Sequence, residues 1–170
     1  MGRKSCNSMR PKELKLFMDI AKRVAEMSYA KRKQVGAVAV KDGNILSISW
    51  NGTPAGTDNC CERIEYYDEI QGYHDDEIQI NYPYANEHGF YKLVTKDIVI
   101  HAESNCLIKC AKEGRSTLGA TLFLTLSPCI SCAKMIFQAG IKEVFYDEEY
   151  RDKTGIDFLN NHGIICIPIN

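Results

Sequence analysis

The segment Thr121-Leu-Phe-Leu-Thr-Leu-Ser-Pro-Cys-Ile-Ser-Cys132 joins an apolar strand to the start of a helix. Its first five residues are large and apolar or β-branched, which favours a buried strand. Ser127 and Pro128 are typical of the N-cap and the first position of a helix. Cys129 and Cys132 are three residues apart, so a helical turn presents both sulfur atoms on one face. The segment therefore predicts two thiolates near a helix N-terminus, where negative charge is favoured.

The segments around it predict a layered α/β domain, because strands alternate with helices along the chain. Asp42-Gly43 between two apolar runs is a strong hairpin signal. Pro11 opens a helix whose apolar residues share one face as far as Ala25. We expect helices at residues 11–25, 101–113, 129–138 and 155–160, and strands at 35–40, 45–50, 98–100, 121–125, 144–146 and 164–169.

The stretch from Asn51 to about Asp97 lacks a clear hydrophobic period and is rich in Asp, Glu, Tyr and Asn. We expect a long loop or an insertion there, which is unusual in a compact domain unless it is functional. The length of 170 residues suits one domain over residues 1–170. The insertion then spans residues 57–97 approximately.

Composition excludes several classes of protein. The net charge of −1 argues against duplex nucleic-acid binding, which usually requires a basic surface. No apolar run approaches the ~20 residues of a membrane-spanning helix. The polar, basic stretch Met1–Pro11 does not resemble a secretory signal. We therefore expect a cytoplasmic protein whose eight cysteines are thiols or metal ligands.

A second motif, His101-Ala-Glu103, lies at the predicted start of another helix. With Cys129 and Cys132, His101 completes three protein ligands for zinc and leaves the fourth position of a tetrahedral site open, as in catalytic zinc sites. A water in an open position of this kind loses a proton near neutral pH. Glu103 is placed to take that proton and to return it to the substrate as a general acid.

Each half of this pattern, taken alone, also occurs in proteins of other classes. A single Cys-x-x-Cys pair is found in redox motifs and in structural zinc sites, and His-x-Glu alone has little meaning. A zinc-stabilised binding module would need a fourth ligand, and none occurs at a natural spacing. His-x-Glu followed by Pro-Cys-x-x-Cys is the signature of zinc deaminases. The complete ligand set and Glu103 oppose a degenerate, purely regulatory deaminase fold.

At these motifs the chain resembles the cytidine deaminase superfamily and, within it, the phage-type deoxycytidylate deaminases. The resemblance implies a three-layer α/β/α fold with a central five-stranded mixed sheet. It also implies zinc-dependent hydrolysis of dCMP to dUMP and ammonia, which supplies the thymidylate pathway, and a homo-oligomer, often a hexamer. The choice of dCMP over other cytosine nucleotides rests on this resemblance. The further matches are Val35-Gly-Ala-Val38, Asn51-Gly-Thr-Pro-Ala-Gly56, Asp58-Asn-Cys-Cys-Glu62 and Leu124-Thr-Leu-Ser-Pro-Cys129.

The resemblance also suggests contacts with the substrate. Asn51 corresponds to the family's asparagine that contacts the sugar, although it is also a typical turn residue before Gly52. Arg32 or Lys33 would hold the 5′-phosphate, with a solvated basic turn as the alternative. Tyr146 and Tyr150 would line the pocket, or else serve as core or surface tyrosines.

Two departures from the family pattern concern regulation and metal content. The family usually has Gly-Tyr where this chain has Ser49-Trp50, in a segment linked to control by nucleotides. Some phage relatives bind a second, structural zinc through cysteines and histidines. Here Cys60, Cys61, His74 and His88 match, Ala30 stands where a further cysteine is expected, and Cys6 is a possible substitute. Cys106, Cys110 and Cys166 lie on apolar faces and are expected to be core residues.

The resemblance further implies activation by dCTP and inhibition by dTTP, with Mg²⁺ accompanying the triphosphate. Such control requires two states of an oligomer that bind the effector unequally. The rival within the same chemistry is a deaminase acting on a base in RNA. It would need a groove for flanking nucleotides, which the nearly neutral charge opposes.

Overall fold

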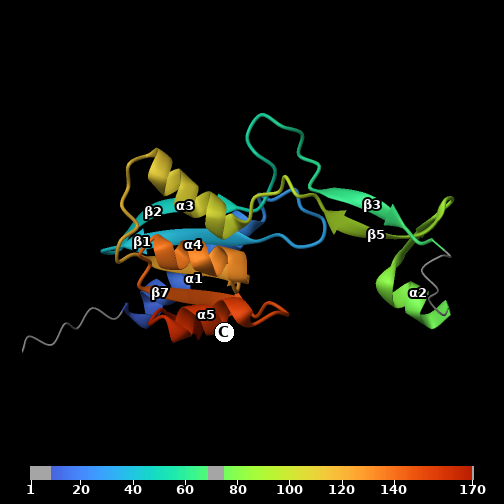
Figure 1. The fold of residues 1–170 in the computed structure, drawn as a ribbon. Coiled ribbons are helices and arrows are strands. Elements are labelled where there is room, and N and C mark those ends of the chain that lie inside the picture. The colour runs from blue at the N-terminus through green and yellow to red at the C-terminus, as the bar shows by residue number, and fades with distance from the viewer. Residues whose placement is uncertain (1–8, 69–74, 170) are drawn as a thin grey trace, which may run out of the picture. The chain divides into compact units, whose positions relative to one another are not determined.

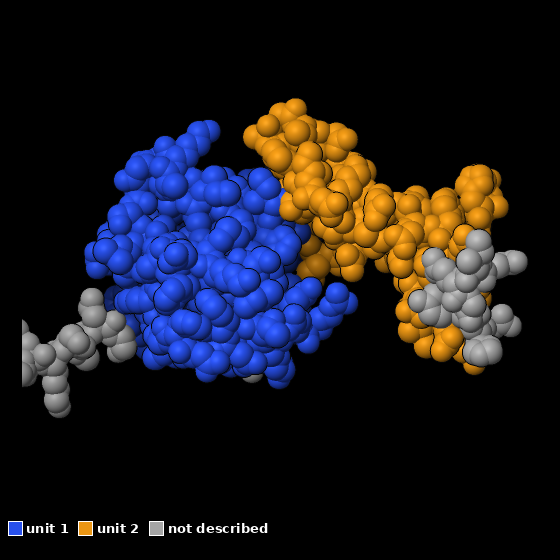
Figure 2. Space-filling view, in the orientation of Figure 1, with its two compact units in different colours: residues 1–28, 34–51, 100–170 blue, residues 29–33, 52–99 orange. Residues whose placement is uncertain are grey.

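The computed structural model describes residues 9–68 and 75–169, and its chain divides into two compact units (Figure 2). The first unit comprises Met1–Ser28, Gln34–Asn51 and Ile100–Asn170. The second comprises Tyr29–Lys33 and Gly52–Val99, and so contains the region of the predicted insertion.

The first unit is built on a five-stranded mixed sheet with the strand order β2-β1-β6-β7-β8 (Figure 1). The β2-β1 and β1-β6 pairs are antiparallel, whereas β6-β7 and β7-β8 are parallel. The predicted five-stranded mixed sheet is confirmed. The strands are β1 (Gly36–Lys41), β2 (Asn44–Trp50), β6 (Thr121–Leu126), β7 (Glu143–Glu148) and β8 (Ile165–Pro168).

Helices cover both faces of this sheet because the strands are apolar on both sides. Val38 and Val40 of β1 pack with Phe17 of helix α1 (Pro11–Ala25) in one core cluster. Ala37 and Ala39, which point to the opposite face, belong to a second cluster. That cluster includes residues of α3 (Ala102–Lys112), α4 (Ile130–Gln138) and α5 (Thr154–Asn161). The predicted three-layer α/β/α architecture is therefore confirmed.

The hairpin between β1 and β2 confirms the Asp42-Gly43 signal. Both turn residues have positive φ, 50° at Asp42 and 76° at Gly43. Two successive positive φ angles are typical of the tight turn that matches the twist of paired strands. Lys41 pairs with Asn44 directly across this turn.

The second unit contains a three-stranded antiparallel sheet with the order β3-β5-β4. The prediction of a long loop is wrong for most of this stretch. Glu62 is the only buried residue of these strands, and polar or charged side chains interrupt the apolar ones, so the strands lack the continuous apolar runs of the first unit. Tyr84 stacks on Tyr91 with ring centroids 5.4 Å apart, and Lys92 pairs with Glu65 at 2.7 Å. The elements are β3 (Glu62–Tyr66), α2 (Asp75–Asn81), β4 (Tyr84–Asn86) and β5 (Gly89–Thr95).

Two local predictions are corrected. The expected strand at residues 98–100 does not form, because the chain turns there with the Val99 amide donating to the Lys96 carbonyl at 3.0 Å. The N-cap of α4 is Cys129 and not Ser127. The Ser127 hydroxyl instead accepts a hydrogen bond from the Tyr150 amide at 2.8 Å.

Among the described residues, no helix is long and apolar enough to cross a membrane.

Candidate metal and catalytic site

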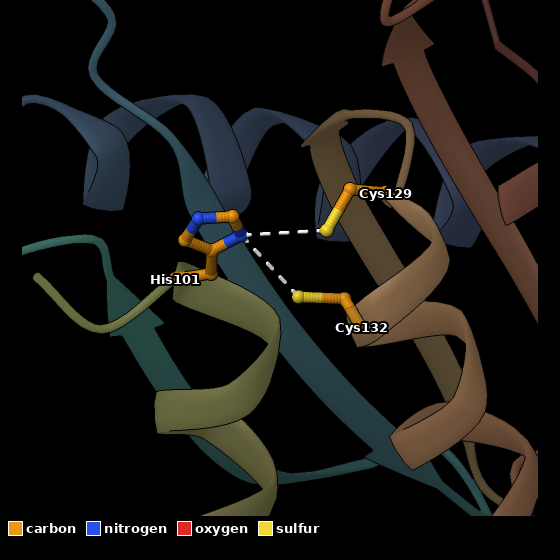
Figure 3. Close-up of side chains that lie close together, drawn as sticks. All are labelled: His101, Cys129 and Cys132. Carbon is orange, nitrogen blue, oxygen red and sulfur yellow. Dashed lines mark hydrogen bonds between the residues drawn. The ribbon is translucent and has the colours of Figure 1, made fainter. Parts of the chain in front are cut away.

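Three side chains predicted as metal ligands converge in the first unit (Figure 3). His101 Nδ1 lies 3.7 Å from Cys129 Sγ and 3.4 Å from Cys132 Sγ. All three candidate ligand atoms lie within 4.8 Å of one another. Figure 3 shows the imidazole and both thiols directed toward a common point from the starts of two helices.

Helix N-termini position two of these ligands. His101 is the N-cap of α3 and Cys129 the N-cap of α4, both with extended backbone angles. Their carbonyls accept the first helical hydrogen bonds, from the Asn105 and Ala133 amides respectively, each at 2.9 Å. Cys132 lies one helical turn beyond Cys129 and is buried. The positive end of α4 favours a thiolate at Cys129, its N-cap.

The donor set and its spacing fit zinc. Zinc–sulfur bonds of about 2.3 Å and zinc–nitrogen bonds of about 2.0 Å separate tetrahedral ligand atoms by roughly 3.5–3.8 Å. The two distances from His101 to the sulfurs match that separation. One imidazole and two thiolates are ligands that zinc prefers, and three protein ligands are the number found in catalytic zinc sites.

The site concentrates interacting titratable groups, which is typical of functional sites. Hydrogen bonds from Cys132 and from His101 lower the pKa of Cys129 to about 3. The hydrogen bond with Cys129 in turn raises the pKa of His101, although partial burial opposes this shift. The shared proton and burial raise the pKa of Cys132. The pKa values of the three side chains therefore depend on one another, and their donor atoms can bind a cation in place of the shared protons.

Glu103 is the fourth predicted member of the site. It lies in the first turn of α3 and is only 4% exposed. Burial raises the pKa of its carboxyl group, while a hydrogen bond from its own amide and the charge of His101 lower it. A carboxyl group whose neutral form is favoured in this way can hold a proton that it has taken from a substrate or water.

Comparison with known families decides the identity of this arrangement. Residues 11–148 match the family model of the cytidine and deoxycytidylate deaminase zinc-binding region. The chain belongs to this family. The matched range contains His101, Glu103, Cys129 and Cys132.

Relatives of this deaminase include several deoxycytidylate deaminases. The enzyme of Enterobacteria phage T4 is 37% identical over 163 residues, covering 86% of this chain and 84% of the relative. That of Mycobacterium phage D29 is 33% identical over 142 residues, covering 82% of this chain and 98% of the relative. The crystal structure of dCMP deaminase from cyanophage S-TIM5, in complex with dCMP and dUMP, is 39% identical. It superposes with a TM-score of 0.75 over 95% of this chain and 100% of that chain.

The start of α3 in this deaminase is anchored to β2 by contacts that no sequence motif indicated. The buried Ser49 hydroxyl donates to the Ala102 carbonyl at 2.6 Å, between His101 and Glu103. The Asn105 side-chain amide donates to the Trp50 carbonyl at 3.1 Å. In the sequence, Ser49 stands out only as a departure from the family's glycine. In the fold, its hydroxyl supports the turn that carries the site.

The start of α4 is held by a close approach of α5. A Cβ atom at Gly155 would lie 2.0 Å from the Pro128 carbonyl oxygen and 2.8 Å from the Cys129 carbonyl carbon. Only glycine therefore allows α5 to pack so near the backbone of Cys129, a predicted metal ligand. The sequence contained one signal, since Gly155 occurs in a predicted helix, where glycine is otherwise unfavourable.

Asn51 and Tyr146, two of the predicted substrate residues of this unit, have structural contacts. Asn51 follows β2, and its side-chain oxygen accepts from the Val35 amide at 2.9 Å. Tyr146 lies in β7 and is buried among the core residues, and this burial raises the pKa of its phenol. Their roles in substrate binding stay predictions.

Arg32, Cys60, Cys61 and His88 belong to the second unit. The Arg32 guanidinium donates to the Thr95 hydroxyl at 3.0 Å, and its phosphate contact stays a prediction. Cys60 is exposed, Cys61 is buried, and His88 lies 3.5 Å from the Glu87 carboxylate. His101, Cys129 and Cys132 form the one metal-compatible cluster in the described ranges 9–68 and 75–169. His74 and Cys6 lie outside those ranges.

Proposed function

We propose that this protein catalyses the zinc-dependent hydrolytic deamination of dCMP to dUMP and ammonia, which supplies the thymidylate pathway. The observation that carries the proposal is the convergence of His101, Cys129 and Cys132 beside the buried Glu103. The relatives named deoxycytidylate deaminase and the S-TIM5 structure with dCMP and dUMP support the choice of substrate.

His101, Cys129 and Cys132 would hold the zinc ion through Nδ1 and two Sγ atoms. When bound, zinc lowers the pKa of a coordinated water toward neutrality, which makes hydrolysis possible at physiological pH. The chain contributes by holding the three ligands at helix starts that packing fixes in place. Neither helix start has to move to bring the donor atoms together.

Glu103 would act as the proton carrier. Its carboxylate takes a proton from the attacking water and delivers it to the pyrimidine ring nitrogen N3, so that carbon 4 becomes electrophilic. It would next take the second proton of that water, by then on the hydroxyl at carbon 4, and pass it to the amino group, which leaves as ammonia while the oxygen becomes the carbonyl of dUMP. Burial supports both roles, because a poorly solvated carboxylate is the more basic and the neutral acid is stable.

Substrate contacts complete the proposal. Asn51 would bind the sugar, Arg32 or Lys33 the 5′-phosphate, and Tyr146 with Tyr150 would line the pocket. The exposed positions of Arg32 and Lys33 support a role in binding a charged group from solution. Phosphate recognition by Arg forms charge-assisted hydrogen bonds, which are among the strong ones in proteins.

The substrate assignment predicts that kcat/KM for dCMP exceeds kcat/KM for deoxycytidine. A charge-assisted contact of about 1.5–3 kcal/mol corresponds to roughly a 10- to 100-fold difference. Arg32→Gln should remove much of this advantage without changing turnover of deoxycytidine. Ammonia release is measured with dCMP, CMP, deoxycytidine and dCTP. Lys12→Gln, which removes a positive charge at another exposed position, is the control. Equal kcat/KM for dCMP and deoxycytidine would contradict the proposal.

We extend the proposal to a second, structural zinc held by Cys60 or Cys61 with His74 or His88. The position of both cysteines within one short segment of the second unit supports it. A structural site is four-coordinate, so freshly purified protein should contain about two zinc ions per chain. Cys60→Ser with Cys61→Ser should reduce this content to one, whereas one zinc per wild-type chain would refute the second site.

We further propose a homo-oligomer, with a hexamer favoured. Ile108, Leu118 and Met135 are exposed apolar residues of the first unit. They line an open cavity of about 600 Å³ between α3 and α4. Exposed apolar patches of this kind commonly mark protein–protein interfaces. Sedimentation of the purified protein would test this, and a monomer at micromolar concentration would refute it.

Regulation by dCTP as activator and dTTP as inhibitor belongs to the same proposal, with Mg²⁺ bound to the triphosphate. The folded insertion supports it, because three strands and a helix offer a defined surface in place of a loop. The test repeats the dCMP saturation curve with each triphosphate. A hyperbolic curve that neither triphosphate shifts would refute regulation by these nucleotides. It would not contradict the zinc chemistry.

A further inference from the structure

Ser104 follows the proton carrier Glu103 directly and has no role in the chemistry proposed above. It lies in the first turn of α3 and is only 8% exposed. Its hydroxyl oxygen lies 3.5 Å from Cys132 Sγ, within hydrogen-bonding distance for sulfur. The contact joins the first turns of the two helices that carry the ligands.

The two cysteine ligands differ in their access to water. Cys129 is half-buried, so water can donate a hydrogen bond to its sulfur. Cys132 is 2% exposed, so its sulfur depends on donors from the protein. A metal-bound cysteine is a thiolate without a proton. In the loaded site the Ser104 hydroxyl must therefore be the donor and Cys132 the acceptor.

Burial of the hydroxyl strengthens this argument. A buried hydroxyl without a partner costs about 1–3 kcal/mol, so a serine in such a place is expected to make a specific contact. Serines within helices usually donate to the carbonyl four residues earlier. Ser104 instead reaches across to the neighbouring helix and to a metal ligand.

We propose that Ser104 is a positioning residue that orients the Cys132 thiolate and tunes its charge by donating a hydrogen bond to Sγ. The inference rests on the zinc site of the proposed function. Donation withdraws electron density from sulfur, so Cys132 transfers less charge to the metal and the ion stays a stronger Lewis acid. It also restricts the side-chain rotation of Cys132. Outer hydrogen bonds of this type typically contribute 10–100-fold to metal affinity or activity.

The experiment compares Ser104→Ala, Ser104→Thr and wild type as full-length protein. Zinc affinity is measured by competition with a chromogenic chelator, and the thiolate-to-metal charge-transfer band is recorded after loading with Co²⁺. Ser104→Ala should bind zinc about 10-fold more weakly, because the Cys132 side chain is no longer held in its metal-binding orientation and this loss outweighs the stronger donation from its sulfur. Its cobalt band should move to longer wavelength, because a thiolate without a donor gives up its electron more readily. Ser104→Thr keeps the hydroxyl and should retain both wild-type properties.

Ser131→Ala is the matched control, because Ser131 lies between the two cysteines but is exposed. It should leave affinity and spectrum unchanged. If Ser104→Ala does not fold, Ser104→Val and Ser104→Thr provide the same comparison, since their side chains differ only by a methyl group in place of the hydroxyl. A wild-type cobalt spectrum and zinc affinity in the variant without the hydroxyl would overturn the proposal. Failure of the wild type to bind Co²⁺ or zinc would instead refute the metal site itself.

Discussion

Glu103→Gln is expected to keep its zinc and to lower kcat for dCMP by about 100- to 10,000-fold, the usual contribution of a general acid–base. Gln has the shape of Glu but cannot accept or return the proton. Its neutral amide also suits a side chain that is 4% exposed. Zinc content by metal analysis and kcat by ammonia release are measured on the same preparation. More than a tenth of wild-type activity in this variant would refute the role of Glu103 as proton carrier.

The ligand variant Cys129→Ser is the control for that experiment. It should lose both zinc and activity, because the hydroxyl of Ser does not supply the thiolate that the site requires. Glu103→Gln should differ from it in metal content alone. This difference in zinc content distinguishes a proton carrier from a fourth metal ligand.

The first unit could be predicted from the sequence because its signals are local and strong. The alternation of Val38 and Val40 with Ala37 and Ala39 follows the two faces of β1. The Asp42-Gly43 turn also requires backbone angles that few other pairs adopt. The convergence of His101, Cys129 and Cys132 was predictable for a similar reason, since the Cys129–Cys132 spacing and the strand before it fix a helix start within a few residues.

The insertion could not be predicted in the same way. In its strands β3 and β5 only Glu62 is buried, and charged residues such as Glu65 and Lys92 interrupt the apolar pattern. Their register depends on cross-strand pairs, for example Tyr66 with Tyr91, which only the folded chain reveals. The composition of the insertion identified it as unusual. Turn and strand residues are mixed too closely there for a hydrophobic period to be recognised.

The supporting contacts of the site were missed because they are not local. Ser49 and Ala102 are separated by 53 residues, and Ser104 and Cys132 by 28. A sequence motif identifies side chains that bind a metal, but the groups that orient them come from other strands and helices. Ser104 offered one weak signal, since it is three residues from His101 and so lies on the same helical face.

Gly155 shows how strongly such a distant contact constrains the site. It lies in α5, 26 positions after Cys129 in the chain, yet it packs on the backbone of Pro128 and Cys129. In an ordinary helix, Ala in place of Gly would stabilise the protein by about 1 kcal/mol. Here the added methyl group would meet the Pro128 carbonyl oxygen at 2.0 Å. A main-chain atom cannot rotate away, so either α5 or the ligand segment has to shift.

Gly155→Ala is therefore expected to lower the free energy of unfolding by about 2 kcal/mol or more, since overpacking typically costs 1–3 kcal/mol and occasionally more. Zinc affinity should fall as well, because the segment that is pushed aside carries Cys129. The measurements are urea denaturation of the zinc-free protein and chelator competition for zinc. Exposed Asn161→Ala in the same helix is the control, and its stability should stay within about 0.5 kcal/mol of wild type. A Gly155→Ala protein as stable as wild type, with unchanged zinc affinity, would show that α5 does not hold the Cys129 segment.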